Sequence, residues 1–185
     1  MSVDSVFRKV KSALETADIP YMVTGSFASS IHGEPRASKD IDFVISATRE
    51  KLIAFIKQFP SDQYYAVEED ALEAFADGQM FNIIDFASGW RIDFIFVKGR
   101  PFSQMEFSRR REEDLGGLKL TVTTPEDILL AKLEWAKMGQ SERQLEDAAS
   151  IIRMKAETLD YAYIERWIKE LELDEQWRAA KFRAG

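Results

Sequence analysis

A short run at residues 40–45, Asp-Ile-Asp-Phe-Val-Ile, constrains the fold of this chain more than any other segment. In an extended strand alternate side chains point to opposite faces, so Asp40 and Asp42 share one face and Ile41 and Phe43 share the other. Two adjacent carboxylates repel each other, and a cation such as Mg²⁺, which prefers oxygen ligands, would offset that repulsion. The run therefore predicts a central strand with one apolar face and one acidic, metal-binding face.

A second strand-like run, residues 91–96, carries a third carboxylate, Asp93, among apolar residues. An unpaired charge in such a run would be costly to bury. If the two runs are neighbouring strands, three carboxylates converge as in a two-metal phosphoryl-transfer site. Two simpler interpretations stay open, because Asp-x-Asp is common at strand ends and turns, and Asp93 could instead pair with Arg91.

Gly25 and Ser26 lie at the junction of an apolar run, residues 21–23, and a segment with helical character, residues 26–31. Backbone N–H groups at a helix start attract phosphate oxygens, and glycine permits a close approach. The Ser26 hydroxyl could add a donor. Gly-Ser is also a common turn and serine a common helix cap, so this dipeptide alone does not define a phosphate site.

The hydrophobic periodicity predicts an α/β (α+β) chain with a mixed N-terminal part, residues 1–123, and a helical C-terminal part, residues 124–185, packed on it. The expected helices cover residues 6–17, 26–31, 48–59 and most of 124–185, and the expected strands cover residues 21–23, 40–45, 80–86, 90–97 and 118–122. Residues 68–77 are expected to form a helix or a surface loop. Residues 161–171 are expected to form the last helix.

Two helix starts can be read from the helical part. Thr124 followed by Pro125 predicts an N-cap and a first helical residue. Ser141 with Gln144 fits a capping box, in which each side chain bonds the backbone N–H of the other residue.

The composition excludes several classes of protein. The 185-residue chain has a net charge of −7 and no cysteine. A broad nucleic-acid-coating surface is not expected, because it would need an excess of Lys and Arg, and residues 109–111 (Arg-Arg-Arg) are interpreted as a solvated strand end or turn. Thiolate zinc sites and disulfides are excluded. No window approaches the roughly 20 apolar residues of a membrane span, and residues 1–11 lack an apolar signal core, so a cytoplasmic protein with no membrane partner is expected.

Lys132 lies near the middle of the apolar stripe of the helix expected at residues 125–138, a stripe that includes Trp135. Lysine is rarely buried unless it is paired. Its ammonium either reaches water at the rim of the helix or points inward to a triphosphate or a carboxylate. Asp147 on the next helix is interpreted as a surface residue paired with Arg143 four positions earlier.

The order of these features resembles the DNA-polymerase-β-type nucleotidyltransferase superfamily. Its pattern is an apolar strand, Gly-Gly or Gly-Ser, a helix, an acidic-x-acidic strand and a carboxylate on a later strand. The stretch from Gly33 to Asp42 is most similar to small prokaryotic members of the abortive-infection and toxin–antitoxin type. Toxin-type members have a lysine and a later aspartate in comparable helices, so the resemblance makes Lys132 and, more weakly, Asp147 candidate site residues. The resemblance implies a small mixed sheet flanked by helices, and an enzyme that uses two Mg²⁺ ions to transfer a nucleotidyl group from a nucleoside triphosphate to a hydroxyl of an RNA end, a protein or a small molecule.

The site residues form two groups. The catalytic and metal-binding group is Asp40, Asp42 and Asp93, and the phosphate-binding group is Gly25, Ser26, Arg36, Lys39 and Lys132. Arg36 and Lys39 belong to the second group because they lie in the loop before Asp40, where they could equally be ordinary surface charges. An antitoxin-like protein is a candidate partner.

Two other functions remain open at this stage. The first is a nucleotidyltransferase fold without activity that serves as a binding or regulatory protein. The second, a nuclease or phosphatase that uses the same carboxylates, gives Gly25 and Ser26 no role.

Overall fold

The structure, a computed structural model, describes residues 3–185. The helices are α1 (Val3–Thr16), α2 (Gly25–His32), α3 (Arg49–Ile56), α4 (Glu68–Asp77), α5 (Pro101–Arg109), α6 (Pro125–Gly139), α7 (Glu142–Lys155), α8 (Tyr161–Glu170) and α9 (Asp174–Ala184). The strands are β1 (Tyr21–Thr24), β2 (Asp40–Ile45), β3 (Tyr64–Tyr65), β4 (Met80–Asp85), β5 (Arg91–Phe96), β6 (Arg111–Asp114) and β7 (Lys119–Val122).

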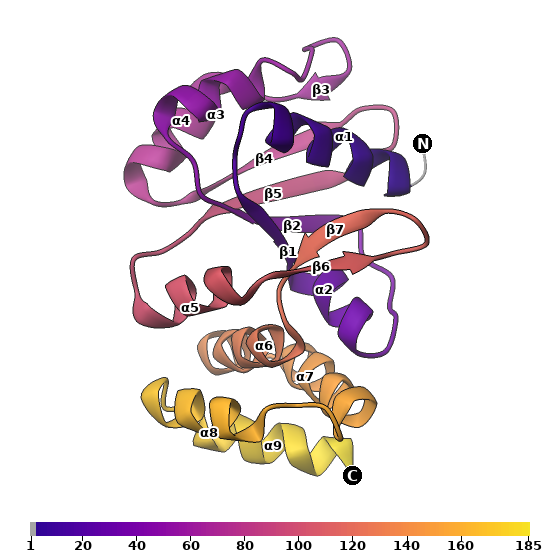
Figure 1. The fold of residues 1–185 in the computed structure, drawn as a ribbon, viewed down its shortest axis with the longest axis vertical. Helices are drawn as coiled ribbons and strands as arrows, with labels where there is room; N and C mark the ends of the chain where they lie inside the picture. Colours follow the sequence, from indigo (N-terminus) through magenta and orange to yellow (C-terminus); the bar gives the residue numbers. More distant parts are fainter. Residues whose placement is uncertain (1–2) are drawn as a thin grey trace. The chain divides into compact units, whose positions relative to one another are not determined.

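The strands formed by residues 3–185 make one seven-stranded mixed sheet in the order β3-β4-β5-β2-β1-β7-β6 (Figure 1). Strand β2 runs parallel to β5, and β1 runs parallel to β7. The pairs β3–β4, β4–β5 and β6–β7 are antiparallel. The predicted mixed α/β class is confirmed, and the two acidic strands, β2 and β5, are direct neighbours.

The chain divides into two compact units. The first contains residues 3–23 and 38–122, and the second contains residues 24–37 and 123–185. Helix α2 therefore groups with the C-terminal helices α6 to α9, although it follows β1 in the chain. The assignment of residues 1–123 and 124–185 as the domains stays a prediction.

Aromatic side chains form the centre of the first unit. Phe43 on β2, Phe94 on β5 and Phe81 on β4 stack side by side, with ring centroids 5.6 and 5.0 Å apart. Phe7 of α1 meets the edge of Phe43, and Phe55 of α3 meets the edge of Phe94. Each such pair adds about 0.5–1.5 kcal/mol beyond its buried area, so α1 and α3 hold this face of the sheet tightly.

In the second unit, α6 packs against α7, and α7 packs against α9. Helix α6 begins as predicted, because the Thr124 hydroxyl accepts a hydrogen bond from the Asp127 N–H and Pro125 is the first helical residue. The capping box predicted at Ser141 is wrong, since this residue occupies the N-cap of α7 but its side chain makes no cap hydrogen bond.

Several elements carry weak sequence signals and were not predicted. Strand β6 is Arg-Glu-Glu-Asp, and it forms only because β7 offers a free edge for pairing. Helix α9 follows the helix expected to be last, and it buries little more than Trp177 and Ala180. Helix α5 and the two-residue strand β3 were also missed. None of the helices in residues 3–185 has the length and hydropathy of a membrane span.

Candidate active site

The three predicted metal-binding carboxylates lie on one face of the sheet. The parallel pairing of β2 with β5 sets Asp42 opposite Asp93 and Asp40 opposite Arg91. Residues opposite each other in paired strands share a face, and so do residues two apart in one strand. Three carboxylates and one guanidinium therefore occupy the corners of a two-by-two array, here called the acidic array.

The two faces of these strands differ in burial. On the face that carries the stacked phenylalanines, Ile41 and Ile92 are fully buried. On the opposite face Asp40 is exposed and Asp42 is half-buried, while Asp93 is only 6% exposed. The alternation predicted from residues 40–45 thus produces one sealed face and one face with accessible carboxylates.

Asp93 has a cationic neighbour. Its Oδ1 atom accepts a hydrogen bond from Arg91 Nε at 2.8 Å, so the pairing considered from the sequence is present. Burial raises the pKa of Asp93, Asp40 raises it further, and the charge and hydrogen bond of Arg91 oppose this without cancelling it. A carboxylate that binds a proton more readily than an ordinary aspartate is suited to accept one from a substrate hydroxyl.

The donor set of the acidic array fits magnesium in its chemistry, because all three acidic corners offer oxygen ligands. Within residues 3–185, however, no group of three or more acidic or histidine side chains is arranged to hold a metal ion. Asp93 Oδ1 is bonded to Arg91, so a cation held by all three carboxylates would lie beside a guanidinium. Metal binding by Asp40, Asp42 and Asp93 stays a prediction.

Gly25 makes the turn from β1 into α2. Its φ angle of 64° lies in the left-handed region, which glycine adopts without the steric cost of a Cβ atom. The N-cap residue Thr24 makes no side-chain cap hydrogen bond at the start of α2. Phosphate binding by Gly25 and Ser26 is untested by this geometry and stays a prediction.

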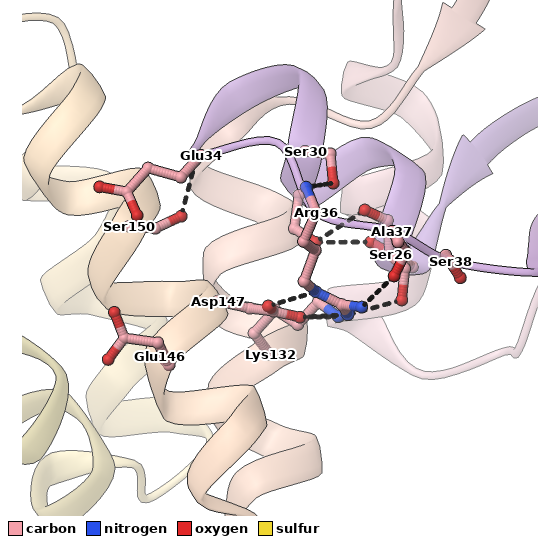
Figure 2. Close-up of polar contacts among 12 residues, drawn as sticks. Ser26, Ser30, Glu34, Arg36, Ala37, Ser38, Lys132, Glu146, Asp147 and Ser150 are labelled. Atoms are coloured by element: carbon pink, nitrogen blue, oxygen red, sulfur yellow. Dashed lines mark hydrogen bonds and ion pairs between the residues drawn. The ribbon is translucent and has the colours of Figure 1, made fainter.

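A buried charge cluster lies within the second unit (Figure 2). Asp147 on α7 accepts hydrogen bonds from Arg36 Nε at 2.7 Å and Arg36 Nη2 at 2.8 Å, and Lys132 Nζ on α6 lies 2.8 Å from its Oδ2 atom. Arg36 Nη2 also donates to the Ser26 hydroxyl oxygen at 2.7 Å. These four residues are called the Asp147 cluster below.

The Asp147 cluster corrects two interpretations drawn from the sequence. Asp147 is 6% exposed and paired with Lys132 and Arg36, so its assignment to a surface pair with Arg143 is wrong. Lys132 is 4% exposed and meets a carboxylate, which was one of its two expected placements. Trp135, expected in the buried stripe of the same helix, is instead 58% exposed.

The pKa of Asp147 is lowered although the residue is buried. Burial alone would raise this pKa, but the hydrogen bonds from Arg36 and Lys132 and their positive charges outweigh it. Asp147 is therefore held as a carboxylate between two cations. The cluster carries two positive charges and one negative charge, which leaves it a net cation.

The predicted site residues divide between the two units. Asp40, Asp42, Asp93 and the exposed Lys39 belong to the first unit, and Gly25, Ser26, Arg36 and Lys132 belong to the second. The structure brings the three aspartates together on one sheet face, and it brings Ser26, Arg36 and Lys132 together around Asp147. From the sequence Asp147 was only a weak candidate, and the surface pair was preferred, although the small residues after it, Ala148 and Ala149, are a signal of close helix packing.

Comparison with solved structures defines the class of fold. An antigenic nucleotidyltransferase-like protein from Paracoccidioides brasiliensis superposes with a TM-score of 0.58 at 16% identity, over 96% of this chain and 91% of that chain. The crystal structure of ANT(2'')-Ia in complex with adenylyl-2''-tobramycin gives 0.57 at 11% identity, over 91% and 96% of the two chains. The solution structure of the antibiotic-resistance factor ANT(2'')-Ia gives 0.55 at 12% identity, over 97% and 94%. This chain therefore has a nucleotidyltransferase fold.

The family follows from the sequence match. Residues 14–180 match the family described as nucleotidyl transferase AbiEii toxin, type IV TA system. The match spans most of the chain, which therefore belongs to this family, and the predicted resemblance to toxin–antitoxin nucleotidyltransferases is confirmed. No curated protein matches the sequence.

Proposed function

We propose that this protein is a magnesium-dependent nucleotidyltransferase that moves a nucleoside monophosphate group from a nucleoside triphosphate to a hydroxyl acceptor. The main observation in support of this proposal is the register of β2 and β5, which puts Asp42 opposite Asp93 on the face that also carries Asp40. Family membership supports the same reaction class. A nuclease or phosphatase with the same carboxylates gains no support from the family.

Asp40, Asp42 and Asp93 would hold the magnesium ions. Magnesium bound there would neutralise triphosphate charge and increase the nucleophilicity of the acceptor hydroxyl. Asp93 takes the proton of that hydroxyl, which is consistent with its raised pKa. The acceptor oxygen forms a bond to the α-phosphorus, the bond from this phosphorus to the bridging oxygen breaks, and pyrophosphate leaves.

The phosphate contacts are proposed for Gly25, Ser26, Arg36, Lys39 and Lys132. Because the Ser26 oxygen already accepts a hydrogen bond from Arg36, its own hydrogen is free to point to another acceptor, such as a phosphate oxygen. Arg36 and Lys132 both contact Asp147, yet their cluster keeps a net positive charge that attracts phosphate.

The acceptor is proposed to be an RNA end, a protein or a small molecule, and an antitoxin-like protein is the proposed partner. These acceptors are proposed because the reaction needs a hydroxyl group. The antitoxin-like partner is proposed because the family is described as a type IV TA system. We also propose that the protein acts in the cytoplasm.

Labelled transfer tests this function. The protein is incubated with magnesium, each of the four labelled triphosphates, and total cellular RNA or lysate, and the labelled product identifies donor and acceptor. Asp42→Asn is expected to reduce transfer by at least about a hundredfold, since electrostatic stabilisation of the transition state depends on the metal ligands. Asp62→Asn, an exposed loop substitution in the same unit, is the control and should keep full activity.

An inactive binding protein is the alternative. It would bind triphosphate in magnesium but release no pyrophosphate with any acceptor pool. Triphosphate binding that remains at full strength in Asp42→Asn would contradict the metal site itself.

A further inference from the structure

Arg91 occupies the fourth corner of the acidic array. It stands opposite Asp40 across the β2–β5 pairing and two residues from Asp93 on the same strand. Its Nε atom donates to Asp93 Oδ1 at 2.8 Å. A guanidinium thus contacts the most buried of the three carboxylates proposed to bind metal.

This contact opposes a metal ion in two ways. A divalent cation at the array would meet the positive charge of Arg91 close by, and like charges at short range repel. The same ion would compete with Arg91 for the charge of Asp93, whose Oδ1 already accepts a hydrogen bond from the guanidinium. Metal alone must therefore bind next to a guanidinium that it either tolerates or displaces.

Arg91 can leave Asp93 without unfolding the strand. Its side chain is 47% exposed, whereas that of Asp93 is 9% exposed. The backbone is fixed by the register with β2, and within residues 3–185 the two terminal guanidinium nitrogens make no hydrogen bond. These nitrogens form a donor fork that suits phosphate oxygens.

We propose that Arg91 is an internal counter-ion that couples metal binding to triphosphate binding, so that the array retains a divalent cation well only together with the triphosphate. This proposal rests on the proposed function. The anion gives the displaced guanidinium a new partner and offsets the charge of the incoming metal. Arg91 is a positioning residue in this scheme, since it acts through Asp93 and through the charge of the array.

Binding linkage gives the scheme a measurable form. If triphosphate strengthens metal binding by some factor, metal strengthens triphosphate binding by the same factor. Removal of the Arg91 charge should then tighten the binding of metal alone and reduce that factor. A residue with a merely structural role would change neither quantity in this direction.

The test measures Mn²⁺ binding to the full chain by electron paramagnetic resonance, first alone and then with inorganic tripolyphosphate, a probe that is independent of the base. Arg91→Met is expected to bind Mn²⁺ alone about three- to tenfold more tightly than the wild type, as expected for loss of one partly exposed ion pair. Equilibrium dialysis of labelled tripolyphosphate with and without Mn²⁺ should give a smaller coupling factor in this variant. Arg91→Lys should have a Mn²⁺ affinity and a coupling factor between those of the wild type and Arg91→Met.

Arg49→Met is the matched control, because it removes the same charge from an exposed position at the start of α3. It should leave both quantities unchanged. Equal or weaker Mn²⁺ affinity in Arg91→Met, or an equal gain in Arg49→Met, would overturn the role of Arg91.

Asp42→Asn separates this outcome from failure of the proposed function. If Asp42→Asn abolishes Mn²⁺ binding but Arg91→Met has no effect, the metal site stands and the counter-ion role is wrong. If wild-type protein and Asp42→Asn bind Mn²⁺ equally, with or without tripolyphosphate, the metal site of the proposed function fails as well.

Discussion

Lys132 on α6 and Asp147 on α7 form a buried ion pair with a Nζ–Oδ2 distance of 2.8 Å. Their side chains are 5% and 7% exposed, and Arg36 contacts the same carboxylate through two nitrogens. One anion thus compensates two cations. This asymmetry predicts that the three side chains differ sharply in their contribution to stability.

Asp147→Ala should be the most destabilising change in the cluster. It leaves Lys132 and Arg36 without their common anion, and breaking a buried pair in this way costs about 3–5 kcal/mol. Urea denaturation at neutral pH measures the loss. Glu146→Ala, at the neighbouring exposed position that pairs with Arg153, should cost less than about 1 kcal/mol. A similar cost for both variants would contradict the assignment.

Lys132→Met should be clearly milder than Asp147→Ala in the same denaturation experiment. Methionine fills most of the volume of the lysine stem, and Asp147 keeps its two hydrogen bonds from Arg36. The large cost of breaking a buried pair comes from a charge left without compensation, and here Arg36 still compensates Asp147. If Lys132→Met costs as much as Asp147→Ala, the two cations do not share the anion as described.

Asp93→Asn should stabilise the fold at neutral pH while it removes a proposed metal ligand. Burial is the main cause of the raised pKa of Asp93, so the folded chain binds a proton here more readily than the unfolded chain. Protonated Asp93 therefore contributes to the free energy of unfolding at low pH. This contribution is lost as the pH rises from the ordinary aspartate pKa through the pKa of Asp93 in the folded chain.

Thermal denaturation in buffer that contains a metal chelator checks whether Asp93→Asn stabilises the fold. The melting temperature of Asp93→Asn should exceed that of the wild type above the folded pKa of Asp93, and the two should converge below the ordinary aspartate pKa. Asp62→Asn should show no such trend. A neutral-pH melting temperature of Asp93→Asn below that of the wild type would contradict the prediction.

Gly33→Ala should destabilise the second unit because the chain passes too close to α7 at this point. A Cβ atom on Gly33 would lie 2.2 Å from the Ser150 hydroxyl oxygen and 2.9 Å from the Ser29 carbonyl oxygen. Overpacking of this kind costs about 1–3 kcal/mol, measurable by urea denaturation.

Ser150→Ala in the same background should recover only part of this loss, since the Ser29 carbonyl is backbone and the Ser150 hydroxyl accepts a hydrogen bond from the Glu34 N–H. Gly139→Ala, where an added Cβ atom meets no atom within 4 Å, is the control. If Gly33→Ala is as stable as the wild type, α2 and α7 separate more easily than the structure indicates.

The sequence predicted the central strands well because their signals are local. The alternation at residues 40–45 identified β2 and its two faces, and the apolar run after Arg91 identified β5. Thr48 caps α3 in the structure, with its hydroxyl accepting a hydrogen bond from the Lys51 N–H. In each case, the residues that define the element are also the residues that stabilise it.

Elements with weak local signals were missed or misassigned. The charged strand β6 depends on the edge of β7, and Asp147 has the sequence context of a surface residue until α6 and the loop with Arg36 pack against it. Arg36 and Asp147, for example, lie more than a hundred positions apart along the chain. Helical periodicity carries no information about contacts at that separation.

The sequence by itself determined that Asp40 and Asp42 share one strand face, that Asp93 lies in a second apolar strand, and that Gly25 and Ser26 separate a strand from a helix. Only the tertiary structure decided that β2 and β5 pair in parallel with Asp42 opposite Asp93, that Arg91 holds Asp93, and that Lys132 and Arg36 share Asp147. The physical reason is that the face of a strand follows from backbone geometry within a few residues. The partner of a charge depends on which distant segment packs closely enough to exclude water around it.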